Sequence, residues 1–463
     1  MMTRCANPSI VRRSRRALIA CAVALLVPFA AEAQPGGAGR GERLTLEEAI
    51  RLALDNNRQL QSARLEIEKA DTDIATARSH RLPVLETKVS ASQLLTPVDF
   101  AFPQGAFGTF PGIGPIPSVD TTVSVPRQPT YYLSGQVSQP LSQLFRIGLG
   151  VQSAVAGREI ERERVRSTQL SLINSVKRMY FAILQTESAL SANAEAIALY
   201  RELDRTLQNR VAQKVALRAD ALDVQFRLAQ EELERTTREN ALASQKEQLN
   251  QLLGRDVRTA FVVEDVSDIS LLDVDLTAAH THALEARPDI REARLKVDQA
   301  ELDRRIAKAE RIPDVSLAVS YTSNLNIDVL PANLATAGVQ LTWEPFDWGR
   351  RKQAVAAKTR TVAQARLNVR EIEDRVVVEI NSRYRTLSEK RALLNVARMS
   401  QATVREKLRV KTNHYQLQAV LLPDVLQVRA ELADADDRYQ QTLLEFWTAK
   451  ADYELAVGEE VRK

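Results

Sequence analysis

Four short segments of the chain alternate apolar and polar residues. In the first, Leu85, Thr87 and Val89 alternate with Glu86 and Lys88. This alternation, with a period of two residues, predicts β-strands with one apolar and one polar face. Lipid-facing barrel strands have this pattern, and so do half-buried strands of soluble sheets. The four segments are residues 84–96, 130–141, 314–323 and 337–345.

The remaining apolar residues recur mainly at helical spacing. Residues 46–82 lack Pro and Gly and are rich in good helix formers, which predicts one helix that ends at Pro83. Residues 151–213 and 350–417 predict two helices of roughly 100 Å each, typical of coiled coils. Shorter helices are expected over 221–256 and 425–458. Two short helices placed end to end would match one long helix.

An internal repeat organises the chain. Residues 53–83 align without gaps with 283–313, and Ala63-Arg64-Leu65 matches Ala293-Arg294-Leu295. A second gapless match pairs Tyr180 with Tyr384, Asp220 with Asp424 and Gly254 with Gly458. Self-similarity of this kind predicts two copies of one structural unit. Each copy is expected to read helix, strand, loop, strand, long helix, turn, helix.

The first copy has extra residues in a loop rich in Pro, Gly and Phe, 97–129. This loop is expected to cap a barrel mouth, to fold onto the barrel or to be a disordered surface loop.

The repeat and the composition predict six regions. The regions are a signal peptide (1–33), a flexible mature N-terminus (34–43), the first repeat (44–256), a linker (257–273), the second repeat (274–458) and a C-terminal tail (459–463).

The N-terminus has the features of an export signal. An Arg-rich start precedes the apolar run Ala17–Ala30 and the small-residue end Ala31-Glu32-Ala33, which predicts cleavage after Ala33. Residues 18–21 also resemble a lipobox, and residues 14–16 weakly resemble a twin-arginine signal. The only cysteines are Cys5 and Cys21, so the mature chain can have no disulfide or thiol chemistry.

Charge and motifs exclude several functions. The net charge of +4 arises in the leader, which holds five Arg and one acid, so the rest of the chain is neutral and a nucleic-acid role has no support. The four histidines lack metal-ligand spacing, and there is no phosphate-binding loop or nucleophile elbow. We therefore expect no enzyme, no metal and no cofactor.

Four strands are too few to close a membrane barrel, because known barrels begin at about eight. An open sheet in lipid would leave unsatisfied edges. The barrel reading therefore requires several chains to share one barrel, and three copies would give about twelve strands.

The order and duplication of these features resemble the TolC family of outer-membrane efflux proteins. The resemblance covers nearly all of 44–458 and includes the opening Leu44-Thr45-Leu46-Glu47-Glu48-Ala49-Ile50. Its other motifs are Leu217-Arg218-Ala219-Asp220-Ala221-Leu222-Asp223-Val224, Leu421-Leu422-Pro423-Asp424-Val425-Leu426-Gln427-Val428 and Trp343-Glu344-Pro345-Phe346-Asp347-Trp348-Gly349, the last echoed by Gln139-Pro140-Leu141.

The resemblance implies an α+β membrane protein that is a homotrimer. A shared 12-stranded β-barrel would sit in the outer membrane, and a long α-helical barrel would cross the periplasm. The hairpin turns would meet a periplasmic adaptor attached to an inner-membrane pump. The implied function is passive export through this duct, with the cargo left open. The alternatives are a soluble periplasmic coiled-coil scaffold and the adaptor itself.

The resemblance also implies which residues would meet partners and membrane. The turn acids Asp220 and Asp424 are expected either to cap the helices after them or to contact the adaptor. The family often has Gly six residues before these acids, where this chain has Lys214 and Gln418. The adaptor-contacting tip would comprise Lys214, Leu217, Asp220, Leu222, Gln418, Leu421, Asp424 and Leu426.

Aromatic residues at the strand ends suggest the membrane boundary. Tyr131, Trp343 and Trp348 are predicted to lie at the membrane interface. For Trp343 and Trp348 the alternative is equatorial packing. Residues 401–423 are basic, with Arg405, Lys407, Arg409 and Lys411 against Glu406, and would favour anionic solutes if they faced a lumen; a solvated outer face is the alternative.

Overall fold

The computed structural model describes residues 42–215, 217–265, 275–326, 331–417, 419–420 and 422–459, without the side chains of 42, 422, 423 and 426. The predicted signal peptide, 1–33, lies outside these residues, and so do Gln418 and Leu421. The architecture below is that of the unit that begins at Arg43.

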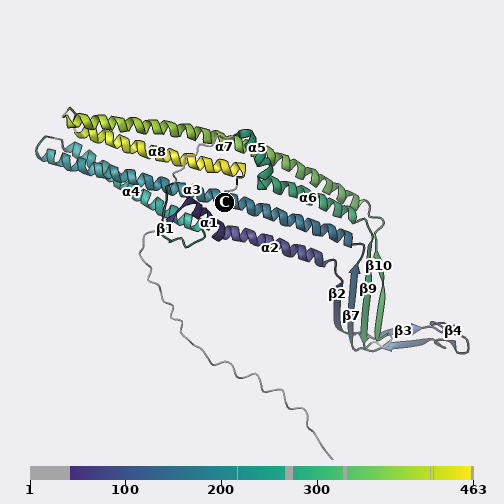
Figure 1. Cartoon of the computed structure of the whole chain (residues 1–463). Coiled ribbons are helices and arrows are strands. Elements are labelled where there is room, and N and C mark those ends of the chain that lie inside the picture. The colour runs from purple at the N-terminus through teal and green to yellow at the C-terminus, as the bar shows by residue number, and fades with distance from the viewer. Residues whose placement is uncertain are drawn as a thin grey trace, which may run out of the picture. The chain divides into compact units, whose positions relative to one another are not determined.

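Two long helical hairpins run side by side (Figure 1). Helix α3 (Leu144–Ala212) turns into α4 (Arg218–Leu252), and α7 (Arg350–Gln416) turns into α8 (Leu422–Val457). Helix α3 packs against both α4 and α8, and α8 packs against α7. With 69 and 67 residues, α3 and α7 are about 100 Å long, as the sequence predicts.

The predicted single helix over 46–82 is wrong. The chain forms α1 (Leu46–Asn56) and α2 (Arg58–Ser79), separated by Asn57 in an extended conformation. The Asn57 side-chain oxygen accepts the N–H of Leu60 at 3.0 Å and so caps α2. Composition alone did not reveal the break, because Asn57 is neither Pro nor Gly.

The second repeat breaks at the equivalent place. Helix α5 (Leu276–Ala286) ends at Arg287, and α6 (Pro288–Ala309) begins with a proline at its first position. Proline is tolerated there because the first N–H groups of a helix have no partner within the helix. Helices α2 and α6 both pack against α3, and α6 also packs against α7.

Each break is fastened to the end of the last helix of its repeat. The side-chain amide of Asn57 donates to the carbonyl of Leu252 at 2.9 Å, and the guanidinium of Arg287 donates to the carbonyl of Ala456 at 2.8 Å. The two donors and the two acceptors are matched pairs in the internal repeat. The two repeats thus share a tertiary contact as well as a sequence pattern.

The four main strands form one antiparallel sheet in the order β10-β9-β7-β2. Strand β2 spans Val84–Gln93 and β7 spans Pro129–Pro140; β9 spans Asp314–Leu325 and β10 spans Asn333–Thr342. All four enter or leave the helices at the same end of the sheet (Figure 1). Strands β2 and β10 form its two edges.

Residues 97–129 are two small antiparallel ribbons rather than an irregular loop (Figure 1). Strand β3 (Val98–Phe102) pairs with β6 (Thr121–Val125), and β4 (Thr109–Phe110) pairs with β5 (Gly114–Pro115).

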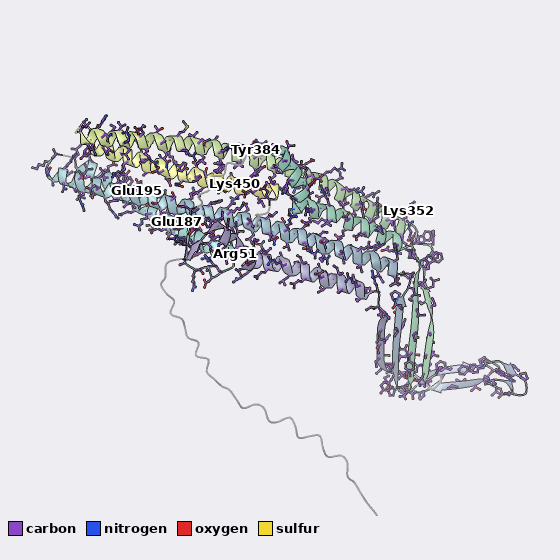
Figure 2. The ribbon with its side chains drawn as sticks, viewed as in Figure 1. Arg51, Glu187, Glu195, Lys352, Tyr384 and Lys450 are labelled. Atoms are coloured by element: carbon purple, nitrogen blue, oxygen red, sulfur yellow. The ribbon has the colours of Figure 1, made fainter. Side chains whose placement is uncertain are left out.

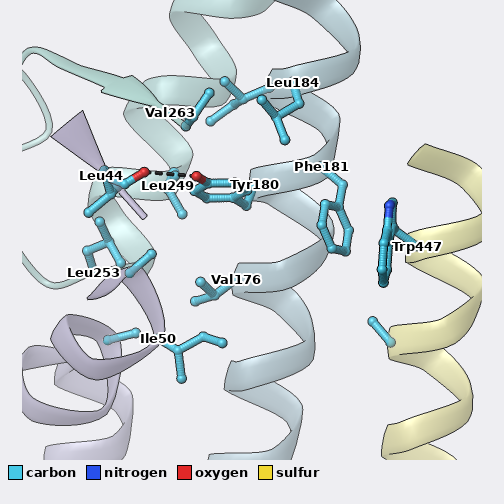
Figure 3. Packing of buried hydrophobic residues seen from close by; sticks show 14 of the residues in the cluster. Leu44, Ile50, Val176, Tyr180, Phe181, Leu184, Leu249, Leu253, Val263 and Trp447 are labelled. Atoms are coloured by element: carbon cyan, nitrogen blue, oxygen red, sulfur yellow. Dashed lines mark hydrogen bonds between the residues drawn. The ribbon is translucent and has the colours of Figure 1, made fainter. Parts of the chain in front are cut away.

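The largest hydrophobic core surrounds Tyr180 near the middle of α3 (Figure 3). Strand β1 (Glu42–Leu44) pairs with β8 (Phe261–Val263), and this ribbon covers the tyrosine. The fully buried Tyr180 hydroxyl lies 2.8 Å from the carbonyl oxygens of Leu44 and Glu264 and accepts the N–H of Glu264 at 2.9 Å. One side chain therefore holds both strands of the ribbon to α3.

A second, smaller core repeats the first by residue. Its buried members Ala283, Ile290, Ile380 and Val457 occupy the repeat positions of Ala53, Leu60, Val176 and Leu253. Both cores form where the broken helix, the long helix and the last helix of a repeat meet. The duplicated pattern of apolar residues thus encodes two equivalent cores.

Candidate functional site: a two-faced sheet and a helical tip

The sheet has one apolar and one polar face. Because residues paired across antiparallel strands lie on the same face, the register assigns whole rows of side chains. One row is Leu85, Val137, Val319 and Ala337; the next, on the opposite face, is Glu86, Gln136, Ser320 and Thr336. The structure therefore confirms the alternation that the sequence predicts.

The apolar face is uncovered. Leu85 is 70% exposed, Val89 74% and Val339 69%. Among the described elements, none packs on this face, because the four strands contact mainly one another. An apolar patch that extends over four strands is far larger than the scattered exposed residues of ordinary soluble proteins, so it marks an interaction surface.

The two edges of the sheet are also open. Strands β2 and β10 each have a described neighbour on one side only, which leaves a row of backbone N–H and C=O groups on the other. Strand directions alternate across the sheet, so β10 of one copy could pair antiparallel with β2 of another. Open edges of this length are sites of strand pairing between chains.

The predicted membrane-interface residues lie at opposite ends of the sheet. Tyr131, 44% exposed, is close to the end that carries the ribbons. Trp343 directly follows β10 at the helical end, and Trp348 lies between β10 and α7 with 89% of its surface exposed. Phe346 contacts Trp348 edge-on, with ring centroids 4.8 Å apart. Trp343 and Trp348 are both exposed in the single chain, so membrane-interface anchoring stays a prediction.

The turn into α7 is held by one carboxylate. Trp348 and Gly349 both adopt positive φ, which directs successive N–H groups toward Asp347. The Asp347 carboxylate accepts the backbone N–H of Arg351 at 2.9 Å and that of Gly349 at 3.1 Å. These bonds, that from Arg351 above all, lower the pKa of Asp347. The Trp-Glu-Pro-Phe-Asp-Trp-Gly motif is thus a helix-starting turn that exposes its aromatic residues.

The turn from α3 to α4 brings four predicted tip residues together at the end of the hairpin. Lys214, Leu217, Asp220 and Leu222 are all exposed. Lys214 has φ of 62° and donates its backbone N–H to Val211, while Val215 donates to Arg210. This pair of bonds is the common ending of helices that have Gly in the left-handed position. Lys214 therefore occupies a position that favours glycine.

The turn acid is not the predicted helix cap. Helix α4 begins at Arg218, and its N-cap is Leu217, which has no side chain that could accept a hydrogen bond. Asp220 lies two residues further, in the first turn, where a negative charge interacts favourably with the helix dipole. The prediction placed the start of α4 three residues too late.

The turn from α7 to α8 resembles the turn from α3 to α4 in the residues that the structure describes. Ala419 donates its N–H to the carbonyl of His414 at 2.9 Å, as Val215 does to Arg210. Asp424 lies in the first turn of α8, within that helix rather than before it, and is exposed. Gln418 and Leu421 lie outside the described residues, and so does the side chain of Leu426.

A groove of about 940 Å³ separates α7 from α8 near this tip. Its charged lining includes Glu406, Lys407, Lys411, Asp424 and Glu431. The basic character predicted for the tip is partly neutralised. Arg409 pairs with Glu406 at 2.6 Å, and this hydrogen-bonded pair lowers the pKa of Glu406. Arg405 lies 3.6 Å from Asp436.

Two features that position these surfaces went unnoticed in the sequence. The first is the fastening of Asn57 and Arg287 to the last helix of each repeat. The second is the hydrogen bonding of Tyr180 to the β1–β8 ribbon. The repeat alignment contains a signal for the bonds of Asn57 and Arg287, because their donors and their acceptors occupy matched repeat positions. The alignment contains no signal for the bonds of Tyr180. Its repeat partner Tyr384 has no such ribbon beside it among the described residues.

The described residues contain no group of three or more His, Cys, Asp or Glu side chains that could hold a metal ion. In the same part of the chain, no helix is both long and apolar enough to cross a membrane.

Known proteins resemble this chain in sequence. The chain is 25% identical to toxin and drug export protein A of Aggregatibacter actinomycetemcomitans over 254 residues, 53% of this chain and 54% of that protein. It is 26% identical to the toluene efflux pump outer membrane protein TtgF of Pseudomonas putida over 286 residues, 62% and 55% of the two proteins. The chain thus spans just over half the length of these curated relatives.

The structural similarity extends further along the chain. The crystal structure of the CmeC outer membrane channel of Campylobacter jejuni matches with a TM-score of 0.72 at 17% identity, covering 89% of this chain and 85% of that one. The mostly helical architecture with a small sheet is therefore shared with solved channel structures. At this identity the likeness concerns the fold alone.

The family profile covers both repeats. Residues 49–255 and 280–458 match the family described as outer membrane efflux protein. The two matched segments fall within the two copies of the structural unit and include all four main strands. This is a family of efflux proteins rather than of enzymes, and it agrees with the resemblance drawn from the sequence motifs. The chain therefore belongs to the outer membrane efflux protein family.

Proposed function

We propose that the protein is the outer-membrane exit duct of an export system. The observation that carries this proposal is the uncovered apolar face of the four-stranded sheet, joined directly to helices of 69 and 67 residues. Lipid would cover the apolar face, and the polar face would line a wet passage. The helices would continue the passage through the periplasm.

The dimensions of the sheet support this placement. Its strands have 10 to 12 residues, close to the 9–11 residues that a tilted strand needs to cross a bilayer. Tyr131 lies toward one end and Trp343 at the other, where amphipathic rings would meet the two head-group layers. Both are exposed, as such anchors must be.

Closure of the duct requires further copies. Strand β10 would pair with β2 of the next chain, and three chains would give twelve strands with no free edge. The helical part also has two open sides. Helix α4 packs mainly on α3, and α7 packs on α5, α6 and α8; neither packs on the other among the described residues. Exposed apolar residues mark both sides: Leu222, Phe226 and Leu233 on α4, and Leu367, Val378, Val396 and Met399 on α7.

A passive duct needs partners that supply energy. The exposed hairpin ends, with Leu217 and Leu222 on one and Asp424 on the other, are proposed to contact a periplasmic adaptor attached to an inner-membrane pump. A signal peptide would direct export of the chain and would be cleaved after Ala33. The pump would select the cargo, and this chain would conduct it outward.

The test is fractionation of the native host, followed by mass measurement of the outer-membrane fraction in mild detergent. We expect an assembly of three chains whose mature N-terminus is Gln34. A soluble monomer in the periplasm would contradict both the membrane placement and the shared barrel. Disruption of the gene should also raise the retention of exported solutes, and unchanged retention across the substrates of all partner pumps would contradict the export role.

A further inference from the structure

We propose that the collar where the sheet meets the helices binds the phosphate groups of anionic phospholipids. The collar comprises residues 78–82, 141–146, 308–312 and 343–352, one segment for each passage between a helix and a main strand. The inference rests on the proposed function, because it assumes that the apolar face of the sheet lies in a bilayer. The inference names the lipid chemistry that the protein would meet in the leaflet next to its helices.

Every segment of the collar carries a basic residue. Arg81 lies between α2 and β2, and Arg311 holds the equivalent position between α6 and β9. Arg146 lies in the first turn of α3, and Lys352 lies in the first turn of α7. Figure 2 shows Lys352 at the end of α7 that adjoins the sheet. Positive charge is thus distributed around the whole junction.

Part of this charge is not neutralised by the residues that the structure describes. Arg146 lies 3.4 Å from Asp314, and Arg350 pairs with Glu344 at 2.6 Å. In contrast, the side chains of Arg81, Arg311 and Lys352 are exposed and have no ion pair with any described residue. Exposed cations attract an anionic surface from within a Debye length, so these three groups can interact with lipid phosphates.

Large apolar side chains surround these cations. Leu82 and Ile312 directly follow Arg81 and Arg311 and are 62% and 46% exposed. The aromatic residues Trp343, Phe346 and Trp348 are exposed and lie in the same collar segment as Lys352. Such rings prefer the head-group layer, and long basic side chains extend from apolar surroundings toward phosphates. The collar therefore combines the two side-chain types that recognise a charged lipid surface.

The other end of the sheet differs. The residues that connect the strands there are 94–97, 126–128 and the described parts of 326–332, and Arg127 is the only basic residue among them. Tyr131 supplies an aromatic ring at that end without an accompanying cluster of cations. Attraction to anionic head groups is thus expected on the helix side only.

The experiment compares lipid retention in matched variants of the full mature chain. In one variant Arg81→Gln, Arg311→Gln and Lys352→Gln remove three collar cations. In the control, Arg398→Gln, Lys407→Gln and Lys411→Gln remove three cations of α7 toward its tip, none of which has an ion pair with a described residue. Each protein is placed in nanodiscs of phosphatidylethanolamine with phosphatidylglycerol. Native mass spectrometry then counts the phosphatidylglycerol molecules that stay bound when the protein is released from the nanodisc.

We expect the wild type and the tip control to retain phosphatidylglycerol equally. Each lost collar cation should weaken retention about fivefold, as expected for a basic residue near an anionic surface. Equal retention by the collar variant, or equal loss by the tip control, would overturn the inference while the wild type still inserts. A wild type that fails to enter nanodiscs would overturn the proposed function and the inference together.

Discussion

Single glycines secure the ends of the two repeats. Gly254 and Gly458 both have positive φ and occupy matched repeat positions, each at the C-terminus of a last helix. A Cβ on Gly254 would clash with the backbone carbonyl of Asn56, whereas a Cβ on Gly458 would meet the side-chain Cγ of Arg287 at 3.1 Å. Backbone cannot give way as a side chain can, so the two positions differ in tolerance.

We predict that Gly254→Ala destabilises the protein by roughly 3–5 kcal/mol, because strain at positive φ adds to the clash. Gly458→Ala, the matched control, should cost only about 1–2 kcal/mol. Guanidinium unfolding followed by circular dichroism measures both. Equal losses would show that the close approach of Asn56 to Gly254 does not constrain the fold.

Lys214 offers a stabilising change. We predict that Lys214→Gly stabilises the end of α3 by about 1 kcal/mol, because glycine adopts a φ of 62° without the steric cost paid by lysine. Hydrogen exchange of the Val215 amide, which bonds to Arg210, reports the change. The control Gln213→Gly, at a φ of −82°, should instead weaken the helix end. Faster exchange in Lys214→Gly would contradict the prediction.

At the scale of elements, the β1–β8 ribbon depends on one tyrosine. Burial raises the pKa of Tyr180 to about 12, above the value near 10 of an unfolded tyrosine. Below pH 10 both states are protonated, and the stabilisation is complete. Between pH 10 and 12 the unfolded chain loses its proton first, so the folded state loses about 2 kcal/mol by pH 12.

We predict that Tyr180→Phe removes this alkaline loss and, at pH 7, costs about 1–3 kcal/mol because the carbonyls of Leu44 and Glu264 lose their shared donor. Unfolding free energies measured from pH 8 to 12 test both effects. Tyr453→Phe is the control, since burial also raises the pKa of Tyr453 to about 12 but its hydroxyl has no hydrogen-bond partner among the described residues. It should reduce the alkaline loss without the cost at pH 7.

At the scale of the whole molecule, the two faces of the sheet should respond oppositely to charge. We predict that Val319→Lys, on the apolar face, costs about 2–4 kcal/mol of membrane stability, whereas Ser320→Lys, on the polar face, costs little. The amount of heat-labile oligomer in the outer membrane measures this. Equal tolerance of the two lysines would contradict a lipid-covered face, and a defect only in Ser320→Lys would reverse the assignment of the faces.

The sequence by itself determined the elements that repeat. Alternation at residues such as Leu85 and Val89 predicted two-faced strands, and the uninterrupted helical spacing along α3 and α7 predicted their length, because both patterns follow from backbone periodicity alone. The duplication predicted that each unit occurs twice. The family motifs pointed to the tip, where Lys214 and Asp220 are exposed and their contact with an adaptor stays a prediction.

Only the tertiary structure decided how these elements are fastened. The side chain of Asn57 bonds to the carbonyl of Leu252, 195 residues away, and that of Arg287 bonds to the carbonyl of Ala456, 169 residues away. Tyr180 similarly depends on backbone groups of two distant strands. Local chemistry marks where the breaks can occur, since Asn57 caps α2 and Pro288 begins α6. It carries no information on which distant backbone groups these residues contact, because the folded chain alone brings those groups together.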